Sequence, residues 1–301
     1  MKYLYYPGCS LKSTGRAYEE SMLAAFNALQ IPLQELDDWN CCGATAYMAI
    51  SELKAFALSA RNFALARQQS DDEVAQLVVP CAACYLGLNK AHRYLEESSD
   101  VTRRVGQALA VAGLSYSNNT RVRHPLDVLT SDIGLDNLKA RVQCHLDGLR
   151  VACYYGCQLV RPYADFDDQH RPQTMDKVMK ALGAQIVDWP LKTRCCGGSL
   201  TGTVEDVGLR LSFILLREAK RRGADVIATA CPLCQFNLEC YQKKMSRRFG
   251  EAVDIPVAYF TQLLGVALGV PNRNLGLHRL FVPIDKQLAA CAATGGVHAH
   301  A

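Results

Sequence analysis

The chain alternates between short apolar runs and longer stretches in which apolar residues recur every three or four positions. Runs typical of buried strands cover residues 3–6, 33–36, 77–79, 151–155, 186–189 and 226–229. Helical spacing covers residues 17–29, 44–68, 172–182 and 204–222. This pattern predicts a β-α-β-α-β-α order that occurs twice. Because parallel strands need a crossover and a helix supplies it, we expect an α/β fold in which each half has a small, mostly parallel sheet flanked by helices.

Three cysteine motifs occur in the same order in both halves. They are a lone cysteine after a glycine, an adjacent pair followed by glycine, and a Cys-x-x-Cys. Their cysteines are Cys9, Cys41, Cys42, Cys81 and Cys84 in the first half and Cys157, Cys195, Cys196, Cys231 and Cys234 in the second. Equivalent motifs lie 148, 154 and 150 residues apart. The repeat predicts two homologous domains, 1–148 and 149–285, related by an approximate two-fold axis, and then a flexible tail over 286–301.

Each motif follows a predicted strand or the loop after one. Open α/β sheets bind their ligands in the loops at the carboxyl ends of the parallel strands. We therefore expect the five cysteines of each half to converge on one site.

Composition and charge narrow the class of protein. Half of the 301 residues are hydrophobic and 21% are charged, as in ordinary folded proteins. The 33 Lys and Arg and the 29 Asp and Glu residues are interspersed, so we expect no nucleic-acid surface. The longest apolar stretches are too short to span a membrane, and the first residues lack the features of a signal peptide. We expect a cytoplasmic protein, free or held at a membrane through partner subunits.

Fourteen cysteines are the outlier in this composition. In a reducing compartment they indicate metal or redox chemistry rather than disulfides. A structural zinc site commonly uses two separated Cys-x-x-Cys pairs or histidines, and adjacent cysteines fit it poorly. Thiolates are the expected ligands of iron–sulfur clusters, whose several irons two neighbouring sulfurs can reach. A zinc site and buried structural thiols remain the alternatives.

In the second half, Cys153 competes with Cys157 for the role of the lone cysteine. Cys157 follows a glycine, as Cys9 does, and it gives the offset of 148 residues. Cys153 would give 144 and lies inside a predicted strand. We therefore expect Cys157 to be the ligand and keep Cys153 as the weaker candidate.

With these spacings, the Cys9, Cys41-Cys42 and Cys81-x-x-Cys84 motifs and their second-half equivalents resemble the paired CCG motifs of the heterodisulfide reductase family, in its B-type subunit. The similarity covers about residues 1–270 and includes residues 156–162 and 172–176. The resemblance implies that each CCG domain holds a noncubane [4Fe–4S] cluster on its five cysteines. It also implies that the two clusters face one disulfide substrate between them.

The resemblance further implies partner subunits. The chain has no ferredoxin-type cysteine run and no Gly-x-Gly-x-x-Gly flavin fingerprint after a strand. We therefore expect no flavin in this chain. We expect its electrons to come from a ferredoxin-like cubane [4Fe–4S] subunit of C type and an FAD-containing subunit of A type.

The expected function is that of the catalytic subunit that reduces or forms a disulfide of small thiols or of a lipoyl carrier protein. The alternative is a non-catalytic electron-transfer subunit of a lactate, glycolate or glycerol-phosphate type or of a quinone-linked oxidoreductase. Lys12, Arg16 and Arg161 follow the lone-cysteine motifs and are candidates to attract an anionic thiol, although surface cations commonly have no such role.

Overall fold

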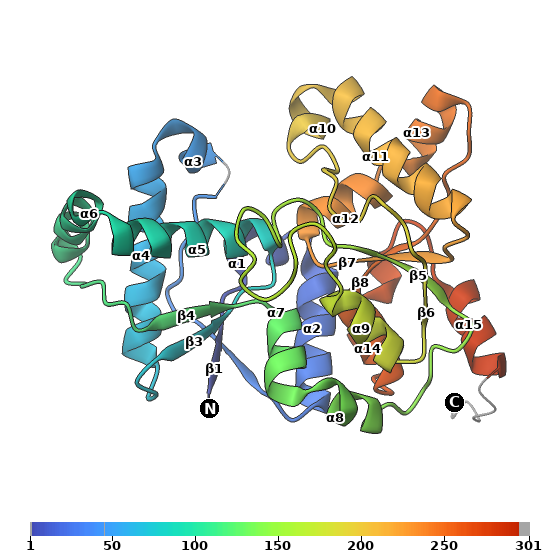
Figure 1. The fold of residues 1–301 in the computed structure, drawn as a ribbon, viewed down its shortest axis with the longest axis horizontal. Coiled ribbons are helices and arrows are strands. Elements are labelled where there is room, and N and C mark those ends of the chain that lie inside the picture. Colours follow the sequence, from blue (N-terminus) through green and yellow to red (C-terminus); the bar gives the residue numbers. More distant parts are fainter. Residues whose placement is uncertain (1, 45, 295–301) are drawn as a thin grey trace.

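Two four-stranded parallel sheets form the frame of the molecule (Figure 1). The structure is a computed structural model, and it describes residues 2–44 and 46–294. The first sheet has the order β2-β1-β3-β4, with β1 (Tyr3–Tyr5), β2 (Leu33–Glu35), β3 (Ala75–Val78) and β4 (Thr120–Arg123). The second has the order β6-β5-β7-β8, with β5 (Arg150–Tyr154), β6 (Gln185–Ile186), β7 (Val226–Thr229) and β8 (Val257–Tyr259). The prediction of two parallel α/β sheets is confirmed.

The central strands of both sheets are equivalent in register and burial. Leu4 of β1 pairs with Gln34 and Leu77, and Ala152 of β5 is paired with Ile227. Strands β1, β3 and β7 are buried along their whole length. Helices cover both faces of such strands, which explains why they are nearly continuous apolar runs.

The helices connect these strands in the order that the pattern predicts. Those of the first half are α1 (Gly8–Leu11), α2 (Arg16–Ala28), α3 (Ala46–Ile50), α4 (Glu52–Gln69), α5 (Ala82–Glu97), α6 (Ser99–Val111), α7 (Pro125–Asp127), the π-helix η1 (Val128–Ile133) and α8 (Leu135–Ala140). Those of the second half are α9 (Thr174–Ala181), α10 (Leu200–Thr203), α11 (Glu205–Arg221), α12 (Pro232–Glu239), α13 (Gln242–Phe249), α14 (Phe260–Ala267), the 3-10 turns η2 (Asn272–Asn274) and η3 (Leu277–Arg279), and α15 (Asp285–Thr294).

Two features differ from the sequence prediction. The helix expected over 44–68 is divided into α3 and α4, because Ser51 has the extended backbone of a helix N-cap (φ −159°, ψ 103°). Each sheet also has a fourth strand, β4 or β8, that the pattern did not show. Strand β4 lacks an apolar run because it contains Arg121 and Arg123, and Arg123 is buried through its ion pairs with Asp127 and Asp132.

The segment predicted as a flexible tail begins as helix. Residues 286–294 belong to α15, where Cys291 is buried, and residues 295–301 lie outside the described residues. The division of the chain at 148/149 falls between α8 and β5 and stays a prediction. Across residues 2–44 and 46–294, no helix combines the length and apolar composition that a membrane span requires.

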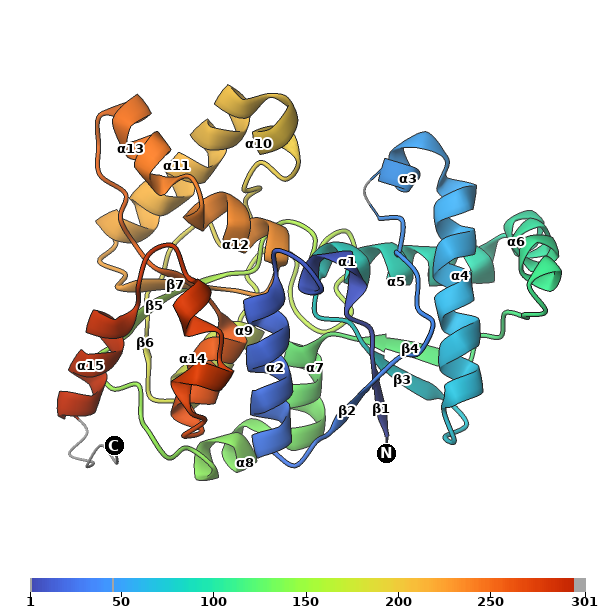
Figure 2. The ribbon, with the colours of Figure 1, turned by 180° about the vertical axis from the view of Figure 1, so that it is seen from behind.

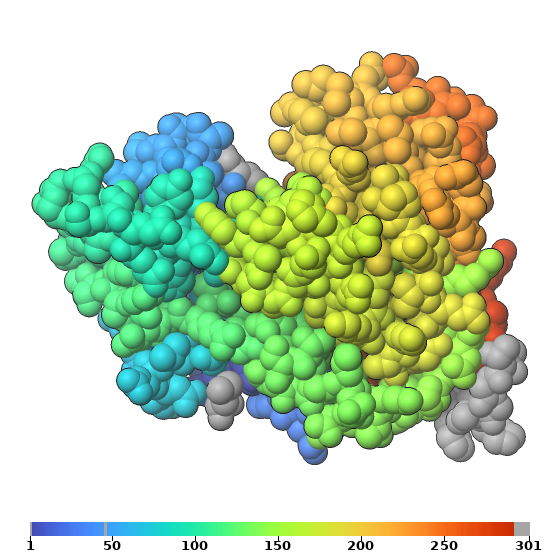
Figure 3. Space-filling view, in the orientation of Figure 1, coloured from blue at the N-terminus to red at the C-terminus, as the bar shows by residue number. Residues whose placement is uncertain are grey.

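Helices of the two halves pack against each other across their interface. Helices α2, α7, α9 and α14 lie between the two sheets (Figures 1 and 2). Helix α2 of the first half packs against α14 of the second, and α9 of the second packs against α7, η1 and α8 of the first. Equivalent elements thus make equivalent contacts, which is the two-fold pseudosymmetry that the repeat predicts. On the outside, Figure 3 shows the molecule hollowed between the lobe with α3 and α4 and the lobe with α10 and α11.

Candidate metal centre

The lone cysteine of each half follows the first strand of its sheet and a glycine with a left-handed backbone. Gly8 has φ +64° and Gly156 has φ +71°. A Cβ atom on Gly8 would lie 3.0 Å from Cys84 Sγ, and one on Gly156 would lie 3.1 Å from Cys234 Sγ. Glycine therefore lets the chain turn and lets its backbone approach a sulfur that belongs to another motif.

The adjacent pair and the Cys-x-x-Cys motif meet in each half. The Sγ atoms of Cys42 and Cys84 are 3.1 Å apart, and those of Cys196 and Cys234 are 3.5 Å apart. All four side chains are buried. Sulfurs that are 42 and 38 residues apart in the chain are thus in contact, as the position of the motifs after parallel strands predicts.

The loop of each adjacent pair folds back on its own sulfur. Gly43 donates its backbone N–H to Cys41 Sγ at 3.4 Å, and Gly197 donates to Cys195 Sγ at 3.3 Å. In the second half, the Cα atom of Gly208 would lie 3.0 Å from a Cβ on Gly197. The glycine after each pair is therefore required by the turn and by the helix that packs on it.

A buried serine supports the second cysteine of each pair. The Ser59 hydroxyl of α4 donates to the carbonyl oxygen of Cys42 at 3.2 Å, and the Ser212 hydroxyl of α11 donates to that of Cys196 at 2.8 Å. The helix after each pair thus fixes the backbone that carries the sulfur.

The Cys-x-x-Cys motifs begin helices. Cys81 is the N-cap of α5 and Cys231 is the N-cap of α12, so Cys84 and Cys234 lie in the first helical turns. A helix N-terminus favours negative charge near its first backbone N–H groups. These four sulfurs therefore occupy positions that suit thiolate ligands.

One buried tyrosine lies beside four of the five cysteines of each group. The Tyr6 hydroxyl donates to the carbonyl oxygen of Asn40 at 2.8 Å, and the Tyr154 hydroxyl donates to that of Arg194 at 2.6 Å. Burial raises the pKa of both tyrosines, and neighbouring cysteines raise it further. Those neighbours are Cys9, Cys41, Cys42 and Cys84 for Tyr6, and Cys157, Cys195, Cys196 and Cys234 for Tyr154.

The crowded thiols shift one another's protonation. Hydrogen bonds from Cys41 and Cys84 lower the pKa of Cys42, and hydrogen bonds from Cys195 and Cys234 lower that of Cys196. Within each adjacent pair, the second cysteine thus has the lower pKa, because its neighbours donate hydrogen bonds to its sulfur.

Cys157 and Cys153 occupy different environments. The Cys157 thiol hydrogen-bonds with Cys195, next to the second group. Cys153 is fully buried inside β5, and its carbonyl oxygen accepts a 3.0 Å hydrogen bond from Trp189. Burial raises the pKa of the Cys153 thiol. The structure therefore brings Cys157 to the group, although the identity of the ligand stays a prediction.

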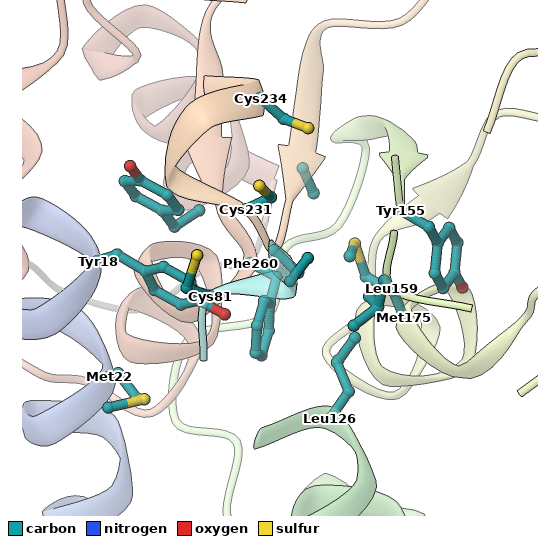
Figure 4. Close-up of a cluster of buried hydrophobic side chains, with 14 of the residues drawn as sticks. Tyr18, Met22, Cys81, Leu126, Tyr155, Leu159, Met175, Cys231, Cys234 and Phe260 are labelled. Carbon is teal, nitrogen blue, oxygen red and sulfur yellow. The ribbon is translucent and has the colours of Figure 1, made fainter. Parts of the chain in front are cut away.

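The two groups adjoin each other at the interface between the halves. A hydrogen bond from Cys231 lowers the pKa of Cys81, so these two thiols are in contact. Figure 4 shows Cys81 and Cys231 next to each other and beside Tyr18 and Phe260. The sequence did not predict this contact, since it depends on how the halves dock.

A pocket of about 580 Å³ reaches the second group of cysteines. Ala44, Ala49 and Ala82 of the first half line one side of it. The other side is lined by Gln158, Ser199, Leu233 and neighbouring residues, among them all five cysteines of the second group. No lysine or arginine lines it among the described residues. The pocket therefore suits a small ligand with an uncharged portion at the sulfurs.

The basic residues considered from the sequence are engaged elsewhere. Lys12 forms ion pairs with Glu19 and Glu35, and Arg16 pairs with Glu20. Arg161 donates to the carbonyl oxygen of Thr193 at 2.8 Å. The structure gives none of them a place in the wall of the pocket.

The donor set fits an iron–sulfur cluster in each half. In the described part of the chain, no three His, Cys, Asp or Glu side chains surround one point as a single metal ion requires. The sulfurs instead spread over an adjacent pair, a helix N-terminus and a strand end. Thiolates distributed in this way can reach the separate irons of one cluster. The five cysteines of each group would be the ligands of one cluster.

Several residues of this centre were not predicted from the sequence. They are Tyr6 and Tyr154, Ser59 and Ser212, and Asn237, whose amide donates to Cys196 Sγ at 3.4 Å. The repeat itself was a usable signal for the tyrosines, which are 148 residues apart like the lone cysteines. Asn237 has no counterpart in the first half, so no repeat could reveal it.

Comparisons with known proteins agree with this geometry. Residues 3–89 and 151–239 match the family described as CCG, cysteine-rich domain. The 8-methylmenaquinol:fumarate reductase membrane anchor subunit of Wolinella succinogenes is 30% identical over 95% of this chain and 98% of its own. The B-type subunit of the ferredoxin:CoB-CoM heterodisulfide reductase of Methanosarcina mazei is 28% identical over 90% and 91%. A protein of Archaeoglobus profundus that is named for its likeness to this B-type subunit is 30% identical over 92% and 94%.

A solved structure shares the fold. The crystal structure of a hypothetical protein from Helicobacter pylori superposes with a TM-score of 0.77 over 94% of this chain, at 16% identity. The chain spans 52% of that protein. At this identity the likeness shows the fold alone.

Proposed function

We propose that this chain, which belongs to the cysteine-rich CCG domain family and carries that domain twice, is the catalytic iron–sulfur subunit of a heterodisulfide-reductase-like complex. Each group of five cysteines would hold one noncubane [4Fe–4S] cluster. The subunit would reduce or form a disulfide of small or carrier-bound thiols between the two clusters.

The contact between Cys81 and Cys231 is the observation that carries this proposal. It connects the two groups directly at the interface. The pocket that reaches the second group also has residues of both halves in its wall. A disulfide in this pocket would lie at the sulfurs of the second group and against residues of the first half, so both halves would contact it.

Reduction breaks the S–S bond and consumes two electrons and two protons to give two thiols; formation of the disulfide is the reverse. When bound, each cluster would supply one electron and an iron that can take one sulfur. The cysteines would hold the clusters, and the helix N-termini at Cys81 and Cys231 would favour the thiolate charge. A ferredoxin-like cubane subunit and an FAD-containing subunit would exchange the electrons.

Metal analysis tests the cofactor. Anaerobically prepared protein should contain about eight irons and about eight acid-labile sulfides per chain, because two four-iron clusters require them. Stoichiometric zinc without labile sulfide would overturn the proposal and leave a zinc-stabilised module.

Disulfide turnover tests the reaction. With an artificial one-electron donor, Cys41→Ser alone or Cys195→Ser alone should abolish turnover, since both clusters are needed. Cys144→Ser, at an exposed cysteine outside the two groups, is the matched control and should keep the wild-type rate. Turnover that survives in either single-group variant would contradict the two-cluster mechanism.

One observation favours a second candidate. The relative from Wolinella succinogenes is named for a fumarate reductase rather than for a disulfide enzyme. The chain would then be a non-catalytic electron-transfer subunit of a quinone-linked, lactate, glycolate or glycerol-phosphate oxidoreductase. In that case the clusters would be reduced by the physiological partner, while no thiol in a broad panel would alter their spectra.

A further inference from the structure

The two groups of cysteines differ at one buried position. Three residues after the second cysteine of each Cys-x-x-Cys motif, α12 has Asn237 and α5 has Gly87. Asn237 is fully buried, and its Nδ2 donates to Cys196 Sγ at 3.4 Å. A Cβ on Gly87 would lie 2.8 Å from the Cβ of Ala44. The first group therefore has no room for an equivalent amide.

The orientation of the Asn237 amide is fixed by its neighbours. Its Nδ2 also donates to the carbonyl oxygen of Gly198 at 2.8 Å, and this oxygen can only accept a hydrogen bond. The Thr201 hydroxyl of α10 donates to Asn237 Oδ1 at 2.8 Å. The NH₂ group must therefore face Cys196, and the sulfur is the acceptor.

The other polar supports of the two groups are equivalent and so cancel in a comparison. Tyr6 and Tyr154 each donate to the carbonyl oxygen of the residue before the adjacent pair. Tyr6 also lies next to Cys42, but its single proton is engaged with Asn40 at 2.8 Å. Among the described residues, Asn237 is thus a side-chain amide that donates to a sulfur of the second group, and the first group has Gly87 at the equivalent place.

We infer that Asn237 is a positioning residue that gives the C-terminal cluster a higher reduction potential than the N-terminal one. The inference rests on the proposed function. Hydrogen bonds to ligand sulfurs raise the potential of an iron–sulfur cluster, because reduction adds negative charge that the donor stabilises. An electron shared between the two clusters would then settle at the C-terminal cluster. All five cysteines of that group line the pocket, so the more easily reduced centre would be the one next to the pocket.

Potentiometric titration of the anaerobically loaded protein, followed by electron paramagnetic resonance, tests this inference. The wild type should show two separate reduction steps. Asn237→Ala should lower the higher step and leave the lower one in place. The expected change is about tenfold in the ratio of oxidised to reduced cluster at fixed potential, or about 59 mV for one electron. Asn237→Leu, which has a similar size and no donor, should lower it at least as far.

Two further variants complete the design. Thr201→Val releases the amide without removing it, and should lower the same step by a smaller amount. Thr201→Val also tests the inference if Asn237→Ala fails to fold. Asn89→Ala is the matched control, because the Asn89 amide of α5 donates to the backbone oxygen of Tyr85 and not to sulfur; it should leave both steps unchanged.

The outcomes separate this inference from the proposed function. Coincident steps in the wild type, equal movement of both steps, or unchanged steps in iron-replete Asn237→Ala and Thr201→Val protein would overturn the inference while the clusters stand. Absence of iron and labile sulfide in the wild type would overturn the proposed function itself.

Discussion

At the scale of the residue, the glycine before each lone cysteine combines two requirements. Its backbone lies in the left-handed region, and a side chain on it would meet a sulfur of the Cys-x-x-Cys motif. A substitution by alanine therefore changes both the energy of the backbone and the space for the ligands. Gly250 isolates the effect on the backbone energy, because it has a left-handed backbone but no neighbouring atom near an added Cβ.

Gly156→Ala and Gly250→Ala form this matched pair. Gly156 has φ +71° and Gly250 has φ +70°, but only the first has a sulfur near its virtual Cβ, Cys234 Sγ at 3.1 Å. Each variant should lose about 1–2 kcal/mol of unfolding free energy to the left-handed backbone. Gly156→Ala should in addition lose about half of the iron, because one of the two clusters is affected, while Gly250→Ala keeps all of it. Equal iron contents would show that the close approach to sulfur does not matter.

The two cysteines of β5 and its following loop give a second prediction at this scale. Cys157→Ser should lower the iron content and change the cluster spectrum, because Cys157 lies beside Cys195. Cys153→Ser should leave both nearly unchanged, since Cys153 is enclosed within a packed strand. Iron analysis and absorption spectra of both variants check this. The reverse result would show that the register of the repeat is wrong.

At the scale of the element, packing of α2 on α14, and of α9 on α7 and α8, joins the two halves. Tyr18 of α2 stacks on Tyr259 at the start of α14, with ring centroids 4.5 Å apart. At the equivalent place, Phe166 stacks on His124 at 5.7 Å. The Tyr18–Tyr259 pair lies close to the contact between the groups of cysteines, since burial, together with Cys231 and Cys81, raises the pKa of Tyr18. Packing of α2 on α14 thus helps to set how the groups adjoin.

A buried hydrogen bond between α2 and α14 allows the contribution of this interface to stability to be tested. Ser21 and Thr261 share a 2.6 Å hydrogen bond, and Ser21 also donates to the carbonyl oxygen of Ala17. Ser21→Ala should cost about 1–3 kcal/mol of unfolding free energy, because it leaves the buried Thr261 hydroxyl without this partner. Adding Thr261→Val should recover part of that loss. Chemical denaturation of the two single variants and the double variant measures the coupling, and strictly additive losses would contradict it.

The elements also show what the sequence could and could not predict. The central strands and the helices α2, α9 and α11 were predictable, because burial imposes a clear periodicity on them. Strand β4 was not, since its buried Arg123 depends on ion pairs that form only in the folded chain. The convergence of each group followed from the repeat and from parallel topology. The contact of Cys81 with Cys231 was not predictable, because it belongs to the docking of two domains.

At the scale of the whole molecule, two buried titratable groups oppose each other in their effect on stability. Burial lowers the pKa of His124 to about 3 and raises that of Glu239 to about 8. The unfolded state binds more protons at histidine below about pH 6.5, so His124 costs stability as the pH falls from there. The folded state keeps the Glu239 proton that the unfolded state has lost above about pH 4.5, so Glu239 costs stability as the pH rises toward 8.

A comparison of the wild type with Glu239→Gln isolates Glu239 between about pH 6.5 and pH 8, because the other titrating groups are the same in both proteins. The carboxyl is almost fully buried beside Gln235 and accepts a 3.3 Å hydrogen bond from the backbone N–H of Val282. Relative to Glu239→Gln, the wild type should lose about 1–2 kcal/mol of unfolding free energy across this window, because each unit of pKa difference is worth about 1.4 kcal/mol. Glu239→Gln carries no titrating proton and should show a shallower slope, while its amide oxygen can still accept from Val282. Denaturant unfolding at several pH values, compared between the two proteins, checks this, and parallel slopes would mean that Glu239 is ionised in the folded protein throughout the window.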